Sequence, residues 1–323
     1  MKQHEREYFA YRVRSGLYTF RLNDQLIVIK PLTIEEKFLV EEGAYSYYAE
    51  AENDGFLWWD DFSKQLKERG LWSEEKEEKI KGLEKDIERL KVELFQNKNK
   101  ENLVSQIRKY LKAGKKQLTD INNEKYEFYD HSIEGVVVQK KFVDFIKKSV
   151  FVRENGEDKP FETDAVGEEN LVKLYSAQCL SEASIRELAR TEPWRSIWVL
   201  RETDTYQLFS NGKTHELTPD QKALLMWSRM YDSVQESMEC PSDDVIEDDD
   251  MLDGWFIIQR KDQEKRRQKS EIDQMTSNSK IGNSDEIFVF ADNQKSADKQ
   301  YLFCVLLLTP GMCGKFDGKI NQQ

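Results

Sequence analysis

Proline and glycine are scarce in this sequence. The 323 residues include only 6 prolines and 15 glycines, which excludes long linkers built from these residues. The four cysteines are scattered, and no two of them have the spacing of a zinc site or suggest a disulfide framework. None of the three histidines has a cysteine or carboxylate at a metal-ligand or catalytic spacing. We therefore predict no metal site.

Catalytic sequence patterns are also missing. The glycine-rich dinucleotide motif, the phosphate-loop motif and the Gly-x-Ser-x-Gly nucleophile motif do not occur. We therefore predict no catalytic residues and no cofactor, and we expect that the protein is not an enzyme. A motif search leaves one alternative open, namely a catalytic site assembled in space from distant carboxylates.

Long apolar segments are absent as well. The longest apolar run, from Tyr301 to Leu308, is far too short to span a bilayer, and the first residues lack the apolar core of a signal peptide. The net charge of −12 argues against a general affinity for nucleic acid or an anionic membrane, although a local basic patch remains an alternative. We expect the protein in the cytoplasm of the cell that makes it.

What the sequence has instead is charge and helical periodicity. Charged residues make up 34% of the chain, which favours a helical, heavily solvated protein. Between Ser73 and about Asp130, a polar stretch at residues 96–102 separates two arms. In each arm, apolar or small residues recur at alternating steps of three and four: Ile80, Leu83, Ile87, Leu90 and Leu94, then Val104, Ile107, Leu111, Gly114, Leu118 and Ile121. This pattern predicts an antiparallel, coiled-coil-like helical hairpin that serves as a spacer or grips a partner.

Turn and capping residues predict further elements. Residues 17–22 and 25–30 flank a turn and predict a β-hairpin. Thr33 and Thr218 each begin a capping box, so a helix is expected after each of them. Later in the chain we expect two strands, a turn, a loop and a long polar helix: strands at 136–138 and 285–291, a turn at Asn155-Gly156, the loop at 156–169 and the helix from about Met251 to Met275.

Together these elements predict a mainly α fold. A helical hairpin projects from helical domains, and a β-hairpin and short strands make a minor contribution. The C-terminal tail from Tyr301 differs in character and is interpreted either as a short terminal strand with a frayed end or as sequence read from another frame. We divide the chain into four consecutive segments: a β-hairpin with helices at 1–72, the helical hairpin at 73–130, a helical domain at 131–240, and an acidic helix start, long helix, strand and tail at 241–323.

Two charged stretches near the C-terminal end require interpretation. The carboxylates between Asp243 and Asp253 lack the ligand spacing of a calcium loop, because Met251 occupies one ligand position and no glutamate stands at the twelfth. We interpret them as a helix start, where carboxylates oppose the positive end of the dipole, with a metal site as the alternative. The basic residues between Arg260 and Lys269 alternate with acidic ones and predict a solvated helix surface, or a face that grips an acidic partner.

Tryptophan supplies the remaining candidates for a binding surface. Trp58 and Trp59 are adjacent, so on a helix their rings point about 100° apart. We favour packing in the core for these rings, with the alternative that one of them reaches a second element or a partner. Three further tryptophans, Trp194, Trp198 and Trp227, are assigned to the core of the second helical domain. The residues that we predict at a partner interface are Trp58, Trp59, Ile87, Leu90, Arg266 and Arg267.

Several short stretches in the last part of the chain carry a resemblance to a known protein type. They are Pro193-Trp194, Thr218-Pro219-Asp220-Gln221, Trp227-Ser228 with Met230-Tyr231-Asp232, Asp253-Gly254-Trp255-Phe256, and Asp285-Glu286-Ile287-Phe288-Val289. The region that contains them, about a third of the chain, resembles proteins of tailed bacteriophages that take part in tail or baseplate assembly. The resemblance implies an accessory protein, either an assembly chaperone or a hub-associated component, and it carries over no catalytic residues. The sequence after Lys299 departs from the continued polar helical pattern that this resemblance leads us to expect.

The sequence therefore leads to two functional hypotheses. The first is a non-enzymatic chaperone or scaffold that binds phage tail or baseplate proteins in the host cytoplasm, free or associated with the virion. The alternative is a nucleic-acid-associated regulatory protein that uses the basic helix around Arg260–Arg267, although the overall charge argues against nucleic acid as a partner. Membrane association is not expected, and the sequence does not predict an oligomeric state.

Overall fold

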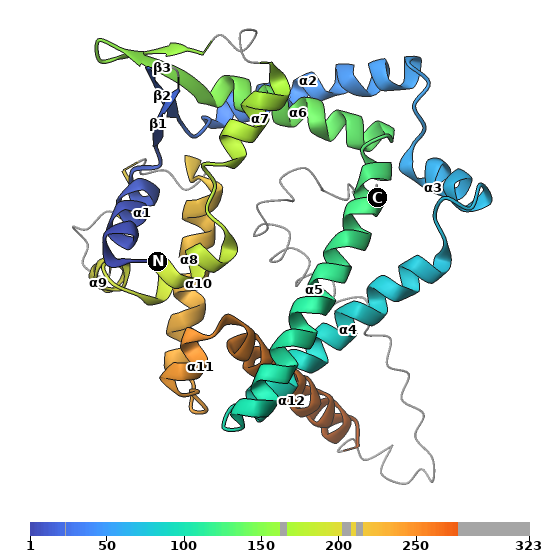
Figure 1. Ribbon diagram of the computed structural model, residues 1–323, viewed down its shortest axis with the longest axis vertical. Helices are drawn as coiled ribbons and strands as arrows, with labels where there is room; N and C mark the ends of the chain where they lie inside the picture. Colours follow the sequence, from blue (N-terminus) through green and yellow to red (C-terminus); the bar gives the residue numbers. More distant parts are fainter. Residues whose placement is uncertain (23, 162–166, 202–207, 211–215, 277–323) are drawn as a thin grey trace. The chain divides into compact units, whose positions relative to one another are not determined.

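The computed structural model describes residues 1–22, 24–161, 167–201, 208–210 and 216–276 (Figure 1). The described residues form twelve helices and one four-stranded antiparallel sheet. This confirms the predicted fold class, which is mainly α with a minor β component. The strand expected at 285–291 and the tail from Tyr301 lie outside the described residues.

The chain forms two compact units, and each is built from separate stretches of sequence. The first, which we call the sheet unit, contains Met1–Leu71 and Lys125–Cys240. The second, the hairpin unit, contains Trp72–Glu124 together with the described residues from Pro241 onward. From the sequence we had expected four consecutive segments. The difference arises because residues after 240 pack on the helical hairpin, a contact between distant sequences that local patterns do not reveal.

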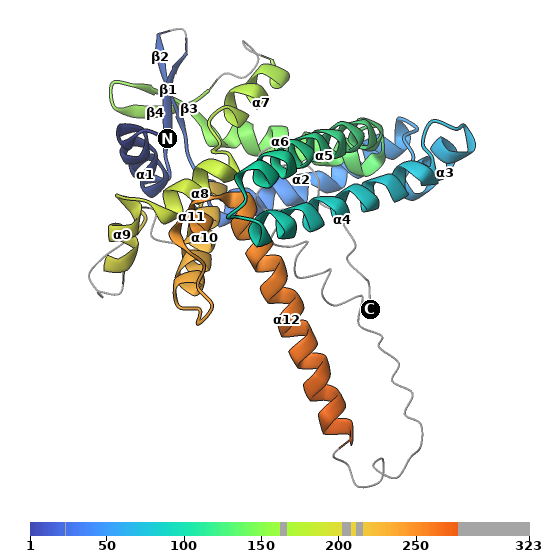
Figure 2. The ribbon, with the colours of Figure 1, turned by 60° about the horizontal axis from the view of Figure 1, so that its bottom comes forward.

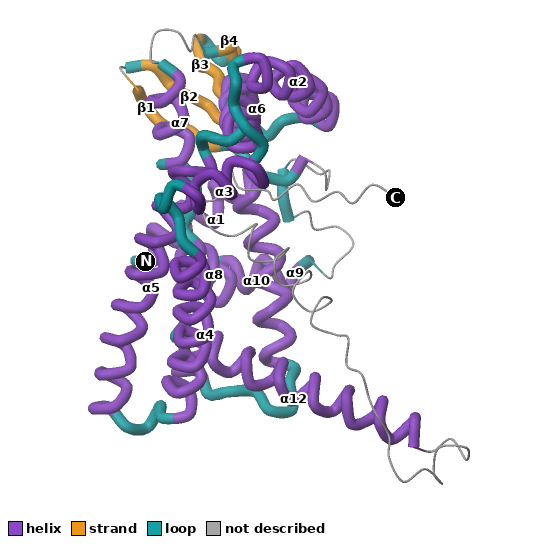
Figure 3. Tube along the Cα trace, turned by 90° about the vertical axis from the view of Figure 1, so that its right-hand side faces the viewer, coloured by secondary structure: helices purple, strands orange, loops and turns teal. Residues whose placement is uncertain are grey.

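The sheet joins two hairpins that are far apart in the sequence. Strands β1 (Tyr18–Leu22) and β2 (Gln25–Ile29) form the first hairpin, as predicted. Strands β3 (Val150–Glu154) and β4 (Glu157–Pro160) form the second, and β2 pairs with β3 to give the order β1-β2-β3-β4, drawn in orange in Figure 3. The segment 156–169 was predicted as a loop, and this was wrong for its first part, because cross-strand pairing with β3 recruits β4.

Helices α6 (Ile133–Ser149) and α7 (Glu168–Ser176) pack on the sheet. Their side chains join those of the strands in one core cluster: Tyr18, Ile27, Ile29, Ile146, Val150, Val152, Leu171 and Tyr175. The short strand predicted at Val136–Val138 is wrong, since these valines lie inside α6. Val137 is fully buried against α2, so tertiary packing overrides the preference of valine for strands.

Helices α2 and α6 lie side by side in the sheet unit (Figure 1). Helix α2 (Ile34–Asn53) begins at the predicted capping box of Thr33 and Glu36, and it buries Val40, Ala44 and Ala51. The short helix α3 (Trp59–Glu68) follows after a turn. Ion pairs on the outside join α2 and α6, with Lys140 donating to Glu50 at 2.7 Å and Lys141 to Glu41 at 2.5 Å.

The remaining helices of the sheet unit form a tryptophan-rich core. Besides α1 (Gln3–Ser15), which the sequence analysis did not predict, they are α8 (Glu182–Arg190), α9 (Trp194–Leu200) and α10 (Pro219–Gln235). Helix α10 begins at the predicted capping box of Thr218 with proline at its first position. Trp194 and Trp198 are almost completely buried and Trp227 is buried, in agreement with their assignment to a core.

The hairpin unit contains the predicted helical pair and two further helices. Its long helices are α4 (Glu74–Gln96), which Ser73 caps as predicted, and α5 (Glu101–Tyr129), whose last residues from Lys125 belong to the sheet unit. Helices α11 (Asp243–Glu247) and α12 (Asp249–Thr276) pack against this pair (Figure 2). The resulting core contains side chains from all four helices: Ile87, Leu94, Ile107, Leu111, Val245 and Met251.

Candidate functional site

Helix α2 carries a row of exposed apolar side chains. Ile34 is 58%, Phe38 is 66% and Tyr45 is 78% exposed. At 3.6 residues per turn these three side chains lie within about 40° of one another, and they extend over roughly 16 Å of helix. We call Ile34, Phe38 and Tyr45 the α2 stripe. Because exposed apolar groups in one row gain free energy when they leave water, the stripe is a candidate contact surface for another protein.

The stripe is separate from the face of α2 that packs inside the protein. The buried residues Val40, Ala44 and Ala51 lie roughly 80° or more around the helix from each residue of the stripe, and the two alanines pack against α6. Helix α2 is therefore apolar on two faces, only one of which is buried within the sheet unit. The stripe was not predicted from the sequence. It could have been recognised there, because the segment after Thr33 has two apolar rows, whereas an ordinary surface helix has one.

Trp58 extends the exposed apolar surface beyond the end of α2. The residue is 43% exposed, and its indole ring stacks on Tyr48 with ring centroids 5.7 Å apart. Its Nε1 donates a hydrogen bond to Glu52 of α2 at 3.2 Å, which holds the ring beside the helix. Trp59 is placed differently, because its half-buried ring lies edge-on to Tyr129 at 5.3 Å between centroids. Of the two adjacent tryptophans proposed for an interface, Trp58 is the one that offers an exposed ring.

Carboxylates surround the stripe. Glu35 and Glu42 are exposed and lie along one side of it, about 40–60° around the helix from Phe38. Glu41 lies on the other side and is paired with Lys141 of α6. The surface is thus apolar along its centre and acidic at its margins. Such a surface is complementary to a partner that presents apolar side chains flanked by lysine or arginine.

The other residues proposed for an interface are placed in the hairpin unit. Ile87 is buried in the core of that unit, and Leu90 is partly buried against the same core, so both hold the helices together. Arg266 and Arg267 lie on the exposed second half of α12, where side chains from Gln263 to Ser270 are all exposed. Arg267 donates to Glu271 at 2.8 Å, so part of its charge is neutralised within the helix.

Acidic residues at the start of α12 pair with basic side chains of α4 and α5. The oxygen–nitrogen distances are 2.7 Å or less in three ion pairs: Asp248 with Arg108, Asp250 with Lys115, and Asp253 with Lys91. Asp248 also accepts a hydrogen bond from the backbone N–H of Met251 at 2.9 Å, in agreement with the interpretation of a helix start. Within the described residues, no group of histidine, cysteine and acidic side chains could hold a metal ion.

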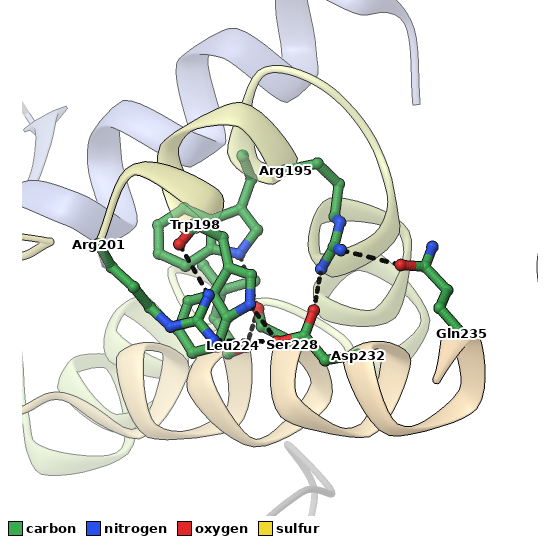
Figure 4. Close-up of polar contacts among 8 residues, drawn as sticks. Arg195, Trp198, Arg201, Leu224, Ser228, Asp232 and Gln235 are labelled. Carbon is green, nitrogen blue, oxygen red and sulfur yellow. Dashed lines mark hydrogen bonds and ion pairs between the residues drawn. The ribbon is translucent and has the colours of Figure 1, made fainter. Parts of the chain in front are cut away.

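Asp232 is the centre of a polar network between α9 and α10 (Figure 4). Its carboxylate accepts hydrogen bonds from Trp198 Nε1 at 2.6 Å, Arg195 at 2.9 Å and Arg201 at 3.1 Å. Partial burial by itself raises the pKa of Asp232, but the hydrogen bonds from Trp198 and Arg195 and the charges of both arginines outweigh it and lower the pKa overall. Since the donors satisfy both oxygens of the carboxylate, we assign this network to stability.

Comparison of the chain with known protein families, curated proteins and solved structures finds no match. Among the described helices, none combines the length and the apolar character that crossing a membrane requires.

Proposed function

We propose that this protein is a non-enzymatic assembly protein of a phage tail or baseplate, which acts as a chaperone or scaffold through protein contacts. The observation that carries the proposal is the α2 stripe, where three large apolar side chains are each more than half exposed in one row. The resemblance of the region after Pro193 to phage tail and baseplate assembly proteins gives the proposal its biological setting.

The surface around the stripe defines the chemistry of the partner. A helix-in-groove or helix-on-helix contact uses apolar side chains at steps of three and four, which matches the spacing of Ile34 and Phe38. The acidic margin formed by Glu35 and Glu42 favours basic residues beside those apolar side chains. The partner segment is therefore an amphipathic helix of a tail or baseplate protein with lysine or arginine at its margins, and Trp58 supplies an aromatic anchor at one end.

Changing the stripe should abolish partner binding without unfolding the protein. In a double variant, Phe38→Glu with Tyr45→Glu, the two largest side chains of the stripe become acidic. We expect the affinity for the partner to fall at least about a hundredfold, because each lost aromatic contact at an interface centre costs roughly 2 kcal/mol or more. The measurement is co-expression with each tail and baseplate protein encoded beside the gene, followed by calorimetry of any complex that forms.

The matched control is Leu39→Glu. Leu39 is 51% exposed on the same helix but lies about 100° away from Phe38, outside the stripe. This variant should bind the partner as the unchanged protein does, and all variants should keep the same helical circular dichroism. The proposal fails if no tail or baseplate protein forms a complex. The assignment of the stripe fails if the double variant binds as tightly as the control.

A further inference from the structure

The four-stranded sheet has two edges, and the register of its strands shows which backbone groups each edge presents. Strand β1 forms one edge and β4 forms the other (Figure 3). In an antiparallel pair, residues that exchange hydrogen bonds alternate with residues whose N–H and C=O groups point the opposite way. The register therefore determines which residues direct their backbone groups out of the sheet.

At the β1 edge, the outward backbone groups belong to Thr19 and Arg21. The backbone N–H of Lys30 donates to the carbonyl oxygen of Ser149 at 2.9 Å, and this pair continues the register of β2 with β3. Even-numbered residues of β2 thus bond to β3, and its odd-numbered residues bond to β1. The β1 residues opposite those odd-numbered residues are Tyr18, Phe20 and Leu22. Thr19 and Arg21 alternate with them and point away from β2.

The two edges differ in what they offer to a further strand. At the β4 edge, the N–H of Phe161 donates to Val150 at 3.1 Å, so the neighbouring Pro160 directs its backbone outward. Proline has no N–H to donate, which blunts this edge. At the β1 edge, Thr19 and Arg21 are exposed, and neither has a backbone partner on the outward side among the described residues. Of the two edges, β1 is the one open to pairing.

The apolar face of β1 also has surface left to bury. Phe20 and Leu22 pack against the core of the sheet unit but are only partly buried, whereas Tyr18 on the same face is buried. A strand added beside β1 would cover more of both side chains. Pairing at this edge would therefore remove apolar surface from water in addition to forming backbone hydrogen bonds.

A second copy of β1 fits this edge in one symmetric register. If two β1 strands run antiparallel with Thr19 of each opposite the partner's Arg21, every outward N–H and C=O group of these residues has a partner. Phe20 then lies opposite the partner's Phe20, an aromatic pair that stabilises antiparallel strands. A shift in one direction places two Arg21 side chains opposite each other, which is unfavourable. A shift in the other direction places Arg21 opposite Leu17, which lies outside the strand.

From the open β1 edge, its partly buried apolar side chains and this self-complementary register, we propose that the protein forms a two-fold symmetric dimer. The two β1 strands pair, and the sheets of both copies become one continuous sheet. This contact goes beyond the proposed assembly function and uses a different element from the α2 stripe. Because each β1 strand has only five residues, the interface is small, and we expect a dissociation constant of about 0.1 mM.

Sedimentation equilibrium of the full chain, from about 1 µM to about 1 mM, measures this dissociation constant. Thr19→Pro removes an outward N–H without removing a bond to β2, and we expect it to raise the dissociation constant at least about tenfold. The matched control, Thr19→Val, keeps the N–H and a β-branched side chain, so it should dimerise as the unchanged protein does. Thermal unfolding shows whether each variant is folded.

Charges at position 19 test the register. Thr19→Glu places a carboxylate opposite the partner's Arg21 and should lower the dissociation constant about fivefold, because opposite charges face each other at two places in the dimer. Thr19→Arg places like charges there and should raise the dissociation constant about fivefold. Combining Thr19→Arg with Arg21→Glu restores opposite charges and should reverse the effect of Thr19→Arg.

The double variant of the α2 stripe, Phe38→Glu with Tyr45→Glu, distinguishes this contact from the surface in the proposed function. It should dimerise as the unchanged protein does. Four results overturn the proposal: a protein that stays monomeric over the whole concentration range, equal dimerisation of Thr19→Pro and Thr19→Val, a change in the same direction for Thr19→Glu and Thr19→Arg, or loss of the dimer in the stripe variant.

Discussion

Replacing Gly254 with alanine is expected to separate α12 from α4 and to destabilise the hairpin unit by about 3 kcal/mol. A Cβ atom at position 254 would lie 2.2 Å from the carbonyl oxygen of Lys91 and 3.1 Å from Cβ of Phe95. The first of these neighbours is helix backbone, which cannot turn aside as a long side chain does. The helices would have to move apart, and the contacts of Met251 and Val245 with the hairpin core would weaken.

The matched control for this change is Gly82→Ala. Gly82 lies in α4 with open space around the position of a Cβ atom. Alanine should therefore stabilise the helix by about 0.5–1 kcal/mol, since glycine is the poorer helix former. Urea unfolding followed by circular dichroism measures both changes. We expect the free energy of unfolding to fall for Gly254→Ala and to rise for Gly82→Ala. If both substitutions stabilise the protein, the close contact between α12 and α4 does not exist in solution.

Replacing Asp232 with alanine should destabilise the sheet unit by about 3 kcal/mol, because it breaks three hydrogen bonds at once and leaves charged and buried donors without their acceptor. Trp198 is 1% exposed, so its indole N–H has little access to water when Asp232 is absent. Arg201, whose guanidinium carbon lies 3.5 Å from the centre of the Trp198 ring, loses the carboxylate that holds it in place.

The pH dependence of stability separates the charge of Asp232 from its hydrogen bonds. The pKa of Asp232 is lowered in the folded protein, so the carboxylate stabilises the fold above its unfolded pKa, and this contribution is lost as the pH falls through the folded pKa. Asp232→Asn keeps an acceptor for Trp198 and removes this titration. We expect Asp232→Asn to lose less stability at neutral pH than Asp232→Ala. In the acid range, the free energy of unfolding of Asp232→Asn should depend less on pH than that of the unchanged protein.

The control for the Asp232 variants is Asp61→Ala. Asp61 forms an exposed ion pair with Lys64 at 2.8 Å, and such pairs contribute little because water and salt screen them. Tryptophan fluorescence during urea unfolding is a suitable measurement, since Trp194 and Trp198 lie beside the network. If Asp61→Ala and Asp232→Ala lower the free energy of unfolding equally, the network of Asp232 stabilises the protein no more than a surface ion pair does.

Local sequence patterns predicted the helix starts well, for a physical reason. A capping residue acts on backbone N–H groups two or three positions away, so its signal is contained in a few neighbouring residues. Thr33, Ser73 and Thr218 each accept the expected hydrogen bond in the structure. The first β-hairpin was predicted for the same reason, because its turn and both strands are adjacent in the sequence.

Features that depend on distant residues were not predicted. The valines at 136–138 prefer strands locally, yet the packing of α6 on α2 and on the sheet makes them helical. Ile87 was proposed for a partner interface, but it packs in the hairpin core, to which α11 and the start of α12 contribute Val245 and Met251. The α2 stripe was missed because only the packing of α2 on α6 determines which of its two apolar rows is buried and which stays exposed.

The pairing of β2 with β3 also affects how the protein can fold while it is being made. Ile29 lies opposite Val150, about 120 residues later in the chain, so at roughly 5–20 residues per second the ribosome delivers the second partner about 6–24 s after the first. During this interval the nascent β1–β2 hairpin has no neighbouring strand, and Ile27 and Ile29 have no core to enter. The N-terminal part of the chain is then accessible to the chaperones and proteases of the cell, and the rate of translation through the helical hairpin determines for how long.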